Sequence, residues 1–475
     1  MAEQTLSQQL ASFAVATMSA GAPTEVRTSV RQRILDVVGL QAAALALETS
    51  DAALAFIDAQ GGSGQARVVG RDEPVPVAWA AFANGVLAHS LDYDDTHLPS
   101  VLHPSASVVP AGLAAAEHMG MDGPAVLDAI GVGIEVVVRV GMAGYDAATN
   151  DSIFFTHGQH ATSICGALGS AVTAGLLGGL DEDRIVDAIG LACSMASGII
   201  EANRTGGTVK RMHCGWAAHA GVCAAQLVKA GFTGPPTALE GRFGFFEAFL
   251  HGVFDASALV DGLGRDWAVP NIFFKPYPAN HFTHTGLDAA RRLREAGLAP
   301  DNIAEAVLGV APSTVRTIGE PLEVKQRPET GYQAQFSGPY LVALGFLGGG
   351  GLGASLDDFT DELARDDKRR KLMARIRVEA DDTCAEIYPH QFPAVLRVRT
   401  CDGRELVEQV LVNRGGPEDP LTDAELREKF RSNAGRSYAG EALDAVEAAV
   451  AGLVDSSASA AAVLAPLGRP TRTTA

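Results

Sequence analysis

Apolar residues recur at steps of three and four from Leu6 to about Gly262, and this spacing constrains the fold more than any other feature of the sequence. In the clearest stretch the steps place five side chains on one helix face: Val26, Val30, Ile34, Val37 and Val38. Pro23, just before this stretch, is typical of a helix start. Comparable patterns occupy residues 77–91, 105–118, 125–141, 161–177, 185–196 and 216–230. The first half is therefore predicted to be a helical bundle.

The pattern changes after about residue 271. Three runs alternate with the period of two that is typical of strands: residues 306–310, 376–378 and 396–398. Residues 283–296 remain helical in their spacing. Asp402-Gly403 lies between two strand-like runs and predicts a two-residue hairpin, in which both turn residues need a positive φ. This part of the chain is therefore predicted to be a smaller α+β unit.

The end of the chain is predicted to be helical again. Thr422-x-x-Glu425 has the form of a capping box, and a stripe of apolar residues follows at Leu443, Val446, Val450 and Leu453. We expect this end to pack on the first domain, and residues 457–475 to form a loose tail. The sequence thus predicts a mainly α protein with three parts: a helical domain (1–270 and 416–456), an α+β domain (271–415) and the tail.

Length and charge narrow the class of protein. A chain of 475 residues is too long for one core of ordinary size, which agrees with two domains. The charge is 37 basic minus 56 acidic residues, or −19, which argues against nucleic acid as a partner. The six cysteines include no C-x-x-C pair, so no zinc or iron–sulfur ligand set is predicted. We find no leader pattern and no membrane-spanning run, and expect a cytoplasmic protein without a membrane partner.

The densest group of chemically useful side chains lies within fifteen residues: His89, Asp92, Asp94, Asp95, Thr96, His97 and His103. Pro99 and Pro104 suggest a loop between two helices, where a scaffold presents polar groups to a ligand. Each residue also has an ordinary explanation, because the aspartates and Thr96 could be helix caps and His89 a hydrogen-bonded core histidine. A purely structural role for all seven fits their density less well than a binding site does.

A second polar segment, residues 156–162, precedes an apolar helix. His160 would lie near the N-terminus of that helix, where the dipole lowers the pKa of a histidine and favours bound anions. Alternatively, Thr162 caps the helix and the histidines are solvated. His157-x-x-His160 has no acidic or thiol partner nearby to complete a metal site, so no metal is predicted.

Lysine is scarce, with seven among the 37 basic residues, which makes individual lysines informative. Lys210 belongs to residues 204–213, a glycine-bearing loop expected ahead of an apolar helix, and could clamp a carboxylate or be solvated. Lys275 lies among aromatic residues and prolines in residues 273–284, at the predicted domain boundary, where small-molecule sites are common and packing or hinge residues also occur. Tyr340 lies at a predicted helix start in the second domain and could reach across a cleft.

Together these segments resemble the MmgE/PrpD family, from about residue 5 to 455. The matching strings are His89-Ser90-Leu91-Asp92-Tyr93-Asp94-Asp95-Thr96-His97 with His103-Pro104-Ser105, then residues 208–213, 275–278 and 335–340. The family includes 2-methylcitrate dehydratase, cis-aconitate decarboxylase and iminodisuccinate epimerase. The resemblance implies a large all-helical domain built from both chain ends, a smaller α+β lid, a homodimer and no cofactor.

The resemblance also implies a set of active-site positions in a cleft: Asp92, Thr96, His103, His160, Lys210, Lys275 and Tyr340. Asn280 is placed at the same cleft, where relatives often have histidine or cysteine, and His160-Ala161-Thr162 replaces a familiar His-Pro-Thr. We expect His160 to be a second proton donor or a carboxylate ligand. Asn280 and Tyr340 would contact the substrate.

The predicted chemistry is proton transfer beside a carboxylate, which needs cations and an acid–base group near neutral pH. We expect Lys210 and Lys275 to hold carboxylates and His103 to be the chief acid–base group, with Asp92 and Thr96 orienting it or the substrate. The first choice of reaction is dehydration of a tricarboxylate such as 2-methylcitrate. Decarboxylation or epimerisation of a related substrate, such as cis-aconitate or iminodisuccinate, is the alternative, and a non-catalytic polycarboxylate-binding protein is a third possibility.

Overall fold

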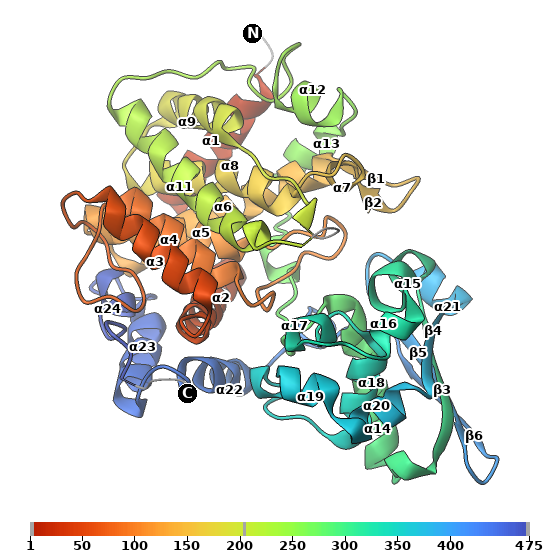
Figure 1. Cartoon of the computed structure of the whole chain (residues 1–475). Coiled ribbons are helices and arrows are strands. Elements are labelled where there is room, and N and C mark those ends of the chain that lie inside the picture. Colours follow the sequence, from red (N-terminus) through yellow and green to blue (C-terminus); the bar gives the residue numbers. More distant parts are fainter. Residues whose placement is uncertain (1–3, 203–205, 472–475) are drawn as a thin grey trace. The chain divides into compact units, whose positions relative to one another are not determined.

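The structure is a computed structural model that describes residues 4–202 and 206–471 (Figure 1). Internal contacts divide the chain into two units: one extends to Ile272 and resumes at Asn433, and the other is Phe273–Ser432. Residues 204 and 205 of the segment that precedes Lys210 lie outside the described residues. No single described helix is long and apolar enough to cross a membrane. One bent pair of helices, Thr24–Ala44 with Glu48–Gln60, is long and apolar enough when the two are taken together.

The first unit is mostly helical over its described residues. Its elements are α1 (Leu6–Ala20), α2 (Thr24–Ala44), α3 (Glu48–Gln60), α4 (Val77–His89), α5 (Ser105–Met119), α6 (Gly123–Ala143), β1 (Tyr145–Asp146), β2 (Asp151–Ser152), α7 (Ile153–Thr156), α8 (Ala161–Leu177), α9 (Glu182–Met195), α11 (Val209–Lys229), α12 (Phe245–Leu250), α13 (Ala256–Val260), η1 (Val269–Asn271), α23 (Gly440–Gly452) and α24 (Ala461–Leu464). The strands β1 and β2 pair antiparallel.

The helices of this unit follow the apolar spacing of the sequence. The five residues of the predicted α2 face are all buried, and Pro23 occupies the N-cap position. The other predicted helices correspond to α4, α5, α6, α8 and α9, with small shifts at their ends. However, α11 begins at Val209 rather than near residue 216, because the chain enters the helix directly after Gly206 and Gly207, both with positive φ. Lys210 therefore lies in the first turn of a helix, not in a loop.

The central helices of the first unit approach one another through small residues. Figure 1 shows α4, α5, α8 and α11 side by side, and α11 packs on both α4 and α8. A Cβ added to Gly85 of α4 would lie 2.7 Å from the Cα of Gly215 in α11. The two backbones are thus in contact, which brings the C-terminal end of α4 next to the first turns of α11.

The second unit is a mixed sheet with helices packed on it. Its elements are η2 (His281–Thr283), α14 (His284–Glu295), η3 (Pro300–Asn302), β3 (Ile303–Val310), α15 (Pro312–Ile318), α16 (Leu322–Lys325), α17 (Gly331–Ala334), α18 (Gly338–Leu347), η4 (Leu356–Asp358), α19 (Asp361–Arg365), α20 (Asp367–Met373), β4 (Ile376–Ala380), α21 (Asp382–Ile387), β5 (Ala394–Thr400) and β6 (Glu405–Val410). The helix α22 (Asp423–Ala434) contains the division between the units.

The sheet of the second unit has the strand order β4-β3-β5-β6. The strands β3 and β4 are parallel, whereas β3–β5 and β5–β6 are antiparallel. Leu308 in the central strand pairs with Val378 on one side and Leu396 on the other. In Figure 1 the helices α14 and α18 lie together beside this sheet, and their contacts with it form the core of the unit.

The predicted β5–β6 hairpin is present, but its turn differs from the predicted one. The loop runs over residues 401–404, and the amide of Thr400 donates to the carbonyl of Arg404 across it. Gly403 has a φ of 87°, whereas Asp402 is not among the described residues with positive φ. Asp402 instead accepts hydrogen bonds from the side chains of Thr400 and Arg404. A longer loop held by side chains replaces the two-residue turn.

The C-terminal helices have the predicted local features. Thr422 and Glu425 exchange the hydrogen bonds of a capping box, and the four residues of the predicted apolar stripe on α23 are buried. The hydroxyl of Ser437 donates to the carbonyl of Ala42 in α2. Residues 457–471, where composition suggested a loose tail, include α24 and a buried Leu467. The first unit is thus built from both parts of the chain, and the described architecture is mainly α, as predicted.

Candidate active site

Five of the eight predicted site residues come together in the first unit. Asp92, Thr96 and His103 lie in the loop between α4 and α5, His160 is the N-cap residue of α8, and Lys210 lies in the first turn of α11. The loop, α8 and α11 converge here because α11 packs on both α4 and α8. Two histidines that were not among the predicted eight join them: His89, the last residue of α4, and His213, one turn after Lys210.

A buried ion pair holds the loop between α4 and α5 in place. The Asp95 carboxylate lies 2.7 Å from an Arg33 guanidinium nitrogen, and the two side chains are 2% and 1% exposed. The same carboxylate accepts hydrogen bonds from the backbone amide and the hydroxyl of Ser105, at the start of α5. Arg33 also donates to the carbonyl oxygens of Val269 and Ile272. These contacts explain Asp95 as a residue that holds the loop in place.

His103 is fixed by the backbone of this loop. Its Nδ1 lies 2.7 Å from the carbonyl oxygen of Asp95. Because a carbonyl oxygen only accepts, Nδ1 must carry a hydrogen, and in the neutral ring Nε2 keeps its lone pair. The Thr96 hydroxyl lies 3.4 Å from the same Nδ1, and the amide of His103 donates to the hydroxyl of Thr162. Thr162 thus supports His103, and His160 takes the N-cap position that Thr162 was considered for.

His160 and His213 form a pair of imidazoles. Their Nδ1 atoms are 2.9 Å apart, so one of them donates and the other accepts. Burial lowers the pKa of His160 well below 6.5, and positive charge on the neighbouring histidines and on Lys210 lowers this pKa further. Burial also lowers the pKa of His213 to about 4, with contributions from His89 and Lys210. Both rings are therefore neutral at pH 7.

Lys210 and Asp92 form an ion pair at a more open edge of this cluster. The Lys210 Nζ lies 3.2 Å from an Asp92 carboxylate oxygen, and the two side chains are 21% and 13% exposed. Asp92 has a φ of 51°, which places a non-glycine residue in the left-handed region. Such a conformation costs free energy and is often found at functional sites. The Lys210 ammonium, which could bind a substrate carboxylate, is thus paired with a strained loop residue, Asp92.

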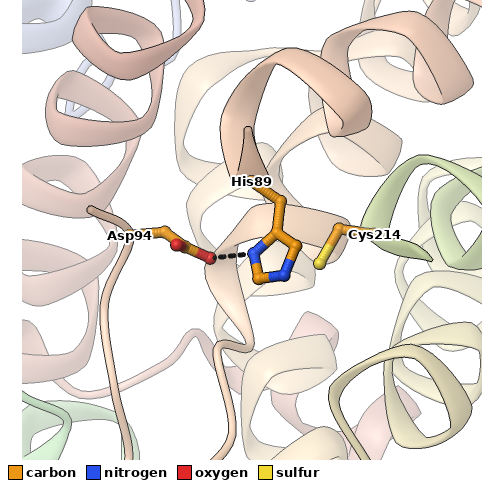
Figure 2. A group of neighbouring side chains, drawn as sticks. All are labelled: His89, Asp94 and Cys214. Carbon is orange, nitrogen blue, oxygen red and sulfur yellow. Dashed lines mark hydrogen bonds and ion pairs between the residues drawn. The ribbon is translucent and has the colours of Figure 1, made fainter. Parts of the chain in front are cut away.

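His89 lies between a carboxyl group and a thiol, both buried. Its Nδ1 is 2.7 Å from the Asp94 carboxylate, and Figure 2 shows the sulfur of Cys214 on the opposite side of the ring from Asp94. The ring of His89 lies 5.4 Å from that of His103 and 5.7 Å from that of His160, measured between centroids. His89 therefore belongs to the same histidine cluster as the predicted residues.

The group of Figure 2 is the set of described side chains with the spacing of metal ligands. One ligand atom from each of His89, Asp94 and Cys214 lies within 4.8 Å of the others. Metal ligands must be deprotonated and free to turn toward the ion. Burial raises the pKa of the Cys214 thiol well above 9, and the Asp94 carboxylate is already hydrogen-bonded to His89. These side chains fit a hydrogen-bonded group better than a set of metal ligands.

The other three predicted residues belong to the second unit. Lys275 is only 2% exposed. The side chain of Asn280 accepts a hydrogen bond from the amide of Phe282 and so caps the short helix η2. Tyr340 is buried in α18, and its hydroxyl donates to the carbonyl oxygen of Asp358. Asn280 and Tyr340 therefore each make a structural contact within their own unit.

A cavity of about 420 Å³ lies beside the same loop of the first unit. Its lining includes His97 and Pro99 from the loop, the Glu135–Arg139 ion pair of α6, and Trp267. None of the eight predicted residues is among the described residues that line it. The cavity therefore adds nothing to the cluster around His103.

The sequence contained weak signals for the two histidines that were missed. His213 is three residues after Lys210, a spacing that places both on one helix face. That relation was hidden because the helix was predicted to begin after both residues. His89 belongs to the predicted polar segment but not to the eight predicted site residues. Its place in the cluster depends on packing between α4 and α11, which no local sequence pattern records.

Comparisons with known proteins agree with the resemblance. "Cis-aconitate decarboxylase-like protein oryM" of Aspergillus oryzae is 27% identical over 91% of this chain and 91% of its own length. Cis-aconitate decarboxylase of Aspergillus terreus is 28% identical, covering 82% of this chain and 81% of its own length. The Homo sapiens cis-aconitate decarboxylase is also 28% identical, with 81% and 78% covered.

The family itself is shown by matches to both of its domains. Residues 8–256 match the MmgE/PrpD N-terminal domain, and residues 277–453 match the MmgE/PrpD C-terminal domain. The relatives are named as decarboxylases, which are lyases. The chain therefore belongs to the MmgE/PrpD family and is an enzyme of lyase type.

Proposed function

We propose that this protein is a cofactor-independent lyase that decarboxylates a small tricarboxylate of the cis-aconitate type. The observation that carries the proposal is the cluster in the first unit. A histidine with a fixed tautomer, His103, lies with two neutral imidazoles and a lysine–aspartate ion pair. Acid–base groups and a cation for the substrate are thus present in one place.

Decarboxylation makes two demands that this cluster can meet. When the C–C bond to the leaving carboxylate breaks, its electron pair stays on the substrate and must be delocalised and then protonated. A cation near a remaining carboxylate lowers the cost of the added charge. Lys210 would supply that cation after exchanging Asp92 for substrate. His103, in its imidazolium form, would give a proton to the carbon from Nε2.

The remaining predicted residues have roles in the same proposal. Thr96 and Asp92 would orient His103 and the substrate, and His160 would be a second proton donor or a neutral carboxylate ligand. Lys275, Asn280 and Tyr340 stay predicted substrate contacts. The proposal keeps the homodimer implied by the family resemblance and the cytoplasmic location expected from the sequence.

The names of the relatives support decarboxylation as the first candidate reaction. From the sequence, dehydration of 2-methylcitrate was the first choice, but two of the compared proteins are named cis-aconitate decarboxylase and the third is named as decarboxylase-like. Dehydration and epimerisation use the same proton chemistry, so they are the alternatives that an experiment must separate. A protein that binds a polycarboxylate without turnover is the remaining alternative.

One assay distinguishes these outcomes. The purified protein is treated with a chelator and incubated separately with cis-aconitate, 2-methylcitrate, citrate and iminodisuccinate, while CO₂, alkene absorbance and optical rotation are followed. We expect CO₂ release from cis-aconitate. Alkene formation from 2-methylcitrate without CO₂ would instead identify a dehydratase, and a change in rotation alone would identify an epimerase. Binding of a polycarboxylate without any change would contradict an enzymatic role.

A further inference from the structure

The proposed function gives no role to the pair formed by His89 and Asp94. Their side chains are 1% and 0% exposed, and the His89 Nδ1 lies 2.7 Å from the Asp94 carboxylate. A carboxylate accepts the hydrogen bond, so Nδ1 carries the hydrogen and Nε2 keeps a lone pair in the neutral ring. Asp94 thus holds His89 in one tautomer and supplies a counter-ion for its charged form.

The second nitrogen of His89 is buried without a partner. Among the described residues no hydrogen-bond partner for His89 Nε2 is present. A buried polar atom without a partner is destabilising, and its persistence calls for a reason. The rings of His103 and His160 lie 5.4 and 5.7 Å away from that of His89, measured between centroids. Nε2 is therefore an acceptor placed beside the proposed acid–base histidines.

His89 lies among charged and titratable groups from the loop between α4 and α5, from α8 and from α11. The titratable groups of the cluster are Asp92, Asp94, Asp95 and His103 from the loop, His160 from the start of α8, and Lys210, His213 and Cys214 from α11. Asp94 is the carboxylate in direct contact with His89. Positive charge on His89 lowers the pKa of both His160 and His213. A proton held on His89 therefore keeps that pair neutral.

We propose that His89, held by Asp94, is a positioning residue that stores the proton which His103 delivers to the substrate. This inference rests on the proposed function, because His89 acts through His103. Decarboxylation replaces a C–C bond by a C–H bond and so consumes one proton in each turnover. After His103 gives its Nε2 proton to the carbon, the proton on His89 Nε2 passes to His103, directly or through one water. His89 returns to the neutral tautomer with its hydrogen on Nδ1 and is reloaded from solvent.

The variant His89→Asn tests the proton-storing role while disturbing the packing of the site little. Its amide nitrogen takes the place of Nδ1 and keeps the hydrogen bond to Asp94, but nothing remains at the position of Nε2. We expect kcat to fall by about tenfold or more, towards the 10²–10⁴ that an acid–base group contributes. KM should stay within about threefold, and the kcat–pH profile should move. Asp94→Asn, which keeps the acceptor but removes the charge, should move the profile in the same direction.

Cys214→Ala is the matched control, because Cys214 lies on the other side of the same ring (Figure 2). It should leave kcat and the pH profile unchanged. Circular dichroism and thermal unfolding of all three variants show whether each is folded. A folded His89→Asn protein with the kcat and pH profile of the wild type would overturn the proposal.

A second readout does not depend on turnover. The twelve histidines are labelled with ¹⁵N, and the signal of His89 is identified by its loss in His89→Asn. In the free wild-type protein we expect hydrogen on Nδ1 of His89, and His160 and His213 should titrate at higher pH in the variant. Hydrogen on Nε2 of His89 together with none on Nδ1 would refute the storage role, because the Asp94 contact would then hold the wrong tautomer. If no substrate is turned over, the proposed function is rejected. The NMR result still tests the His89 proposal, because it is measured on the protein without substrate.

Discussion

Hydrogen bonds decide which nitrogen of each clustered histidine can exchange a proton. Nδ1 of His103 is committed to the carbonyl of Asp95, so proton exchange at that ring takes place at Nε2. Nδ1 of His89 is likewise committed to a carboxylate. His160 and His213 are bonded to each other through Nδ1, and both are neutral at pH 7 because their pKa values are lowered. Among these rings, His103 is thus the one presented for chemistry by the backbone.

The first prediction concerns His103. Replacing it with alanine removes the proposed acid–base group, and we expect kcat to fall by about 10² or more. The measurement is initial rate against substrate concentration for the purified variant. His97→Asn is the control in the same loop, because an asparagine can keep the hydrogen bond that His97 makes to Ser100. Turnover near that of the wild type in His103→Ala would reject the role.

The second prediction concerns the ammonium of Lys210. Lys210→Met keeps the length of the side chain and removes its charge, so the substrate carboxylate loses a partner and Asp92 loses its counter-ion. We expect KM to rise at least tenfold, because the substrate carboxylate loses its cation, and kcat to fall as well, because the charge added in the reaction loses the same cation. Lys229→Met, at the exposed end of the same helix, is the control and should have no effect. An unchanged KM would show that Lys210 does not bind substrate.

At the residue scale, local sequence was enough to find five of the seven residues of the cluster but not to complete it. Asp92, Thr96 and His103 were found because they are crowded into one segment. The partners of these residues could not be deduced, since hydrogen bonds such as His103 to Asp95 depend on loop geometry. His213 was missed because a basic, polar first turn conceals the start of α11.

At the scale of elements, the contact between α4 and α11 positions the histidine cluster. The end of α4 carries His89, and the first turns of α11 carry Lys210 and His213. The helices can approach this closely because glycines face each other, Gly85 on α4 and Gly215 on α11. These two glycines thus set the distance between the two groups of side chains.

The third prediction tests this contact. A Cβ at Gly215 would lie 2.4 Å from the carbonyl oxygen of Phe82, and backbone atoms cannot rotate out of the way. We expect Gly215→Ala to lower the free energy of unfolding by about 1–3 kcal/mol, as overpacking does, and to reduce kcat by displacing His213 from His89. Urea unfolding and initial rates measure the two effects.

Gly440→Ala is the control for that prediction. Gly440 is the first residue of α23, and a Cβ added there meets no atom within 4 Å. Alanine is the better helix former, so stability should stay unchanged or rise by up to about 1 kcal/mol. If Gly215→Ala were as stable and active as this control, the close approach would not matter for the site.

Sequence patterns predicted the helices better than they predicted the turn of the hairpin. The helices of the first unit were predicted well because a long apolar period is a strong signal. The β5–β6 hairpin was correct in its strands but wrong in its turn, since the Asp402 side chain bonds to Thr400 and Arg404 and stabilises a longer loop. Side-chain hydrogen bonds of this kind compete with the standard turns and are not encoded in a dipeptide.

At the scale of the whole molecule, the mainly α fold and the family were predicted correctly. Both family domains match, and the described helices dominate both units. The choice of reaction was less determined by sequence, because dehydration, decarboxylation and epimerisation all need cations and a proton donor or acceptor beside a carboxylate. Substrate assays must therefore decide between them.

The fourth prediction concerns the stability of the whole molecule against acid. Burial lowers the pKa of His97, His213 and His219 to about 4. In the unfolded chain a histidine titrates near 6.5, so between these two values the unfolded state binds more protons than the folded state. The stability that these three rings contribute is present above pH 6.5 and is lost as pH falls toward 4. At pH 5 the loss is about 2 kcal/mol for each ring.

Urea unfolding at pH 7, 6 and 5 measures this loss. The interval lies above the usual range of carboxyl groups, so histidines dominate the slope. His219 packs between Trp79 and Trp216, away from the proposed chemistry, and its replacement by glutamine should remove about a third of the three-ring slope while leaving turnover unchanged. Equal unfolding free energies at pH 7 and pH 5 would mean that these rings are solvated in the folded protein. The neutral His160–His213 pair assumed for the site would then be wrong as well.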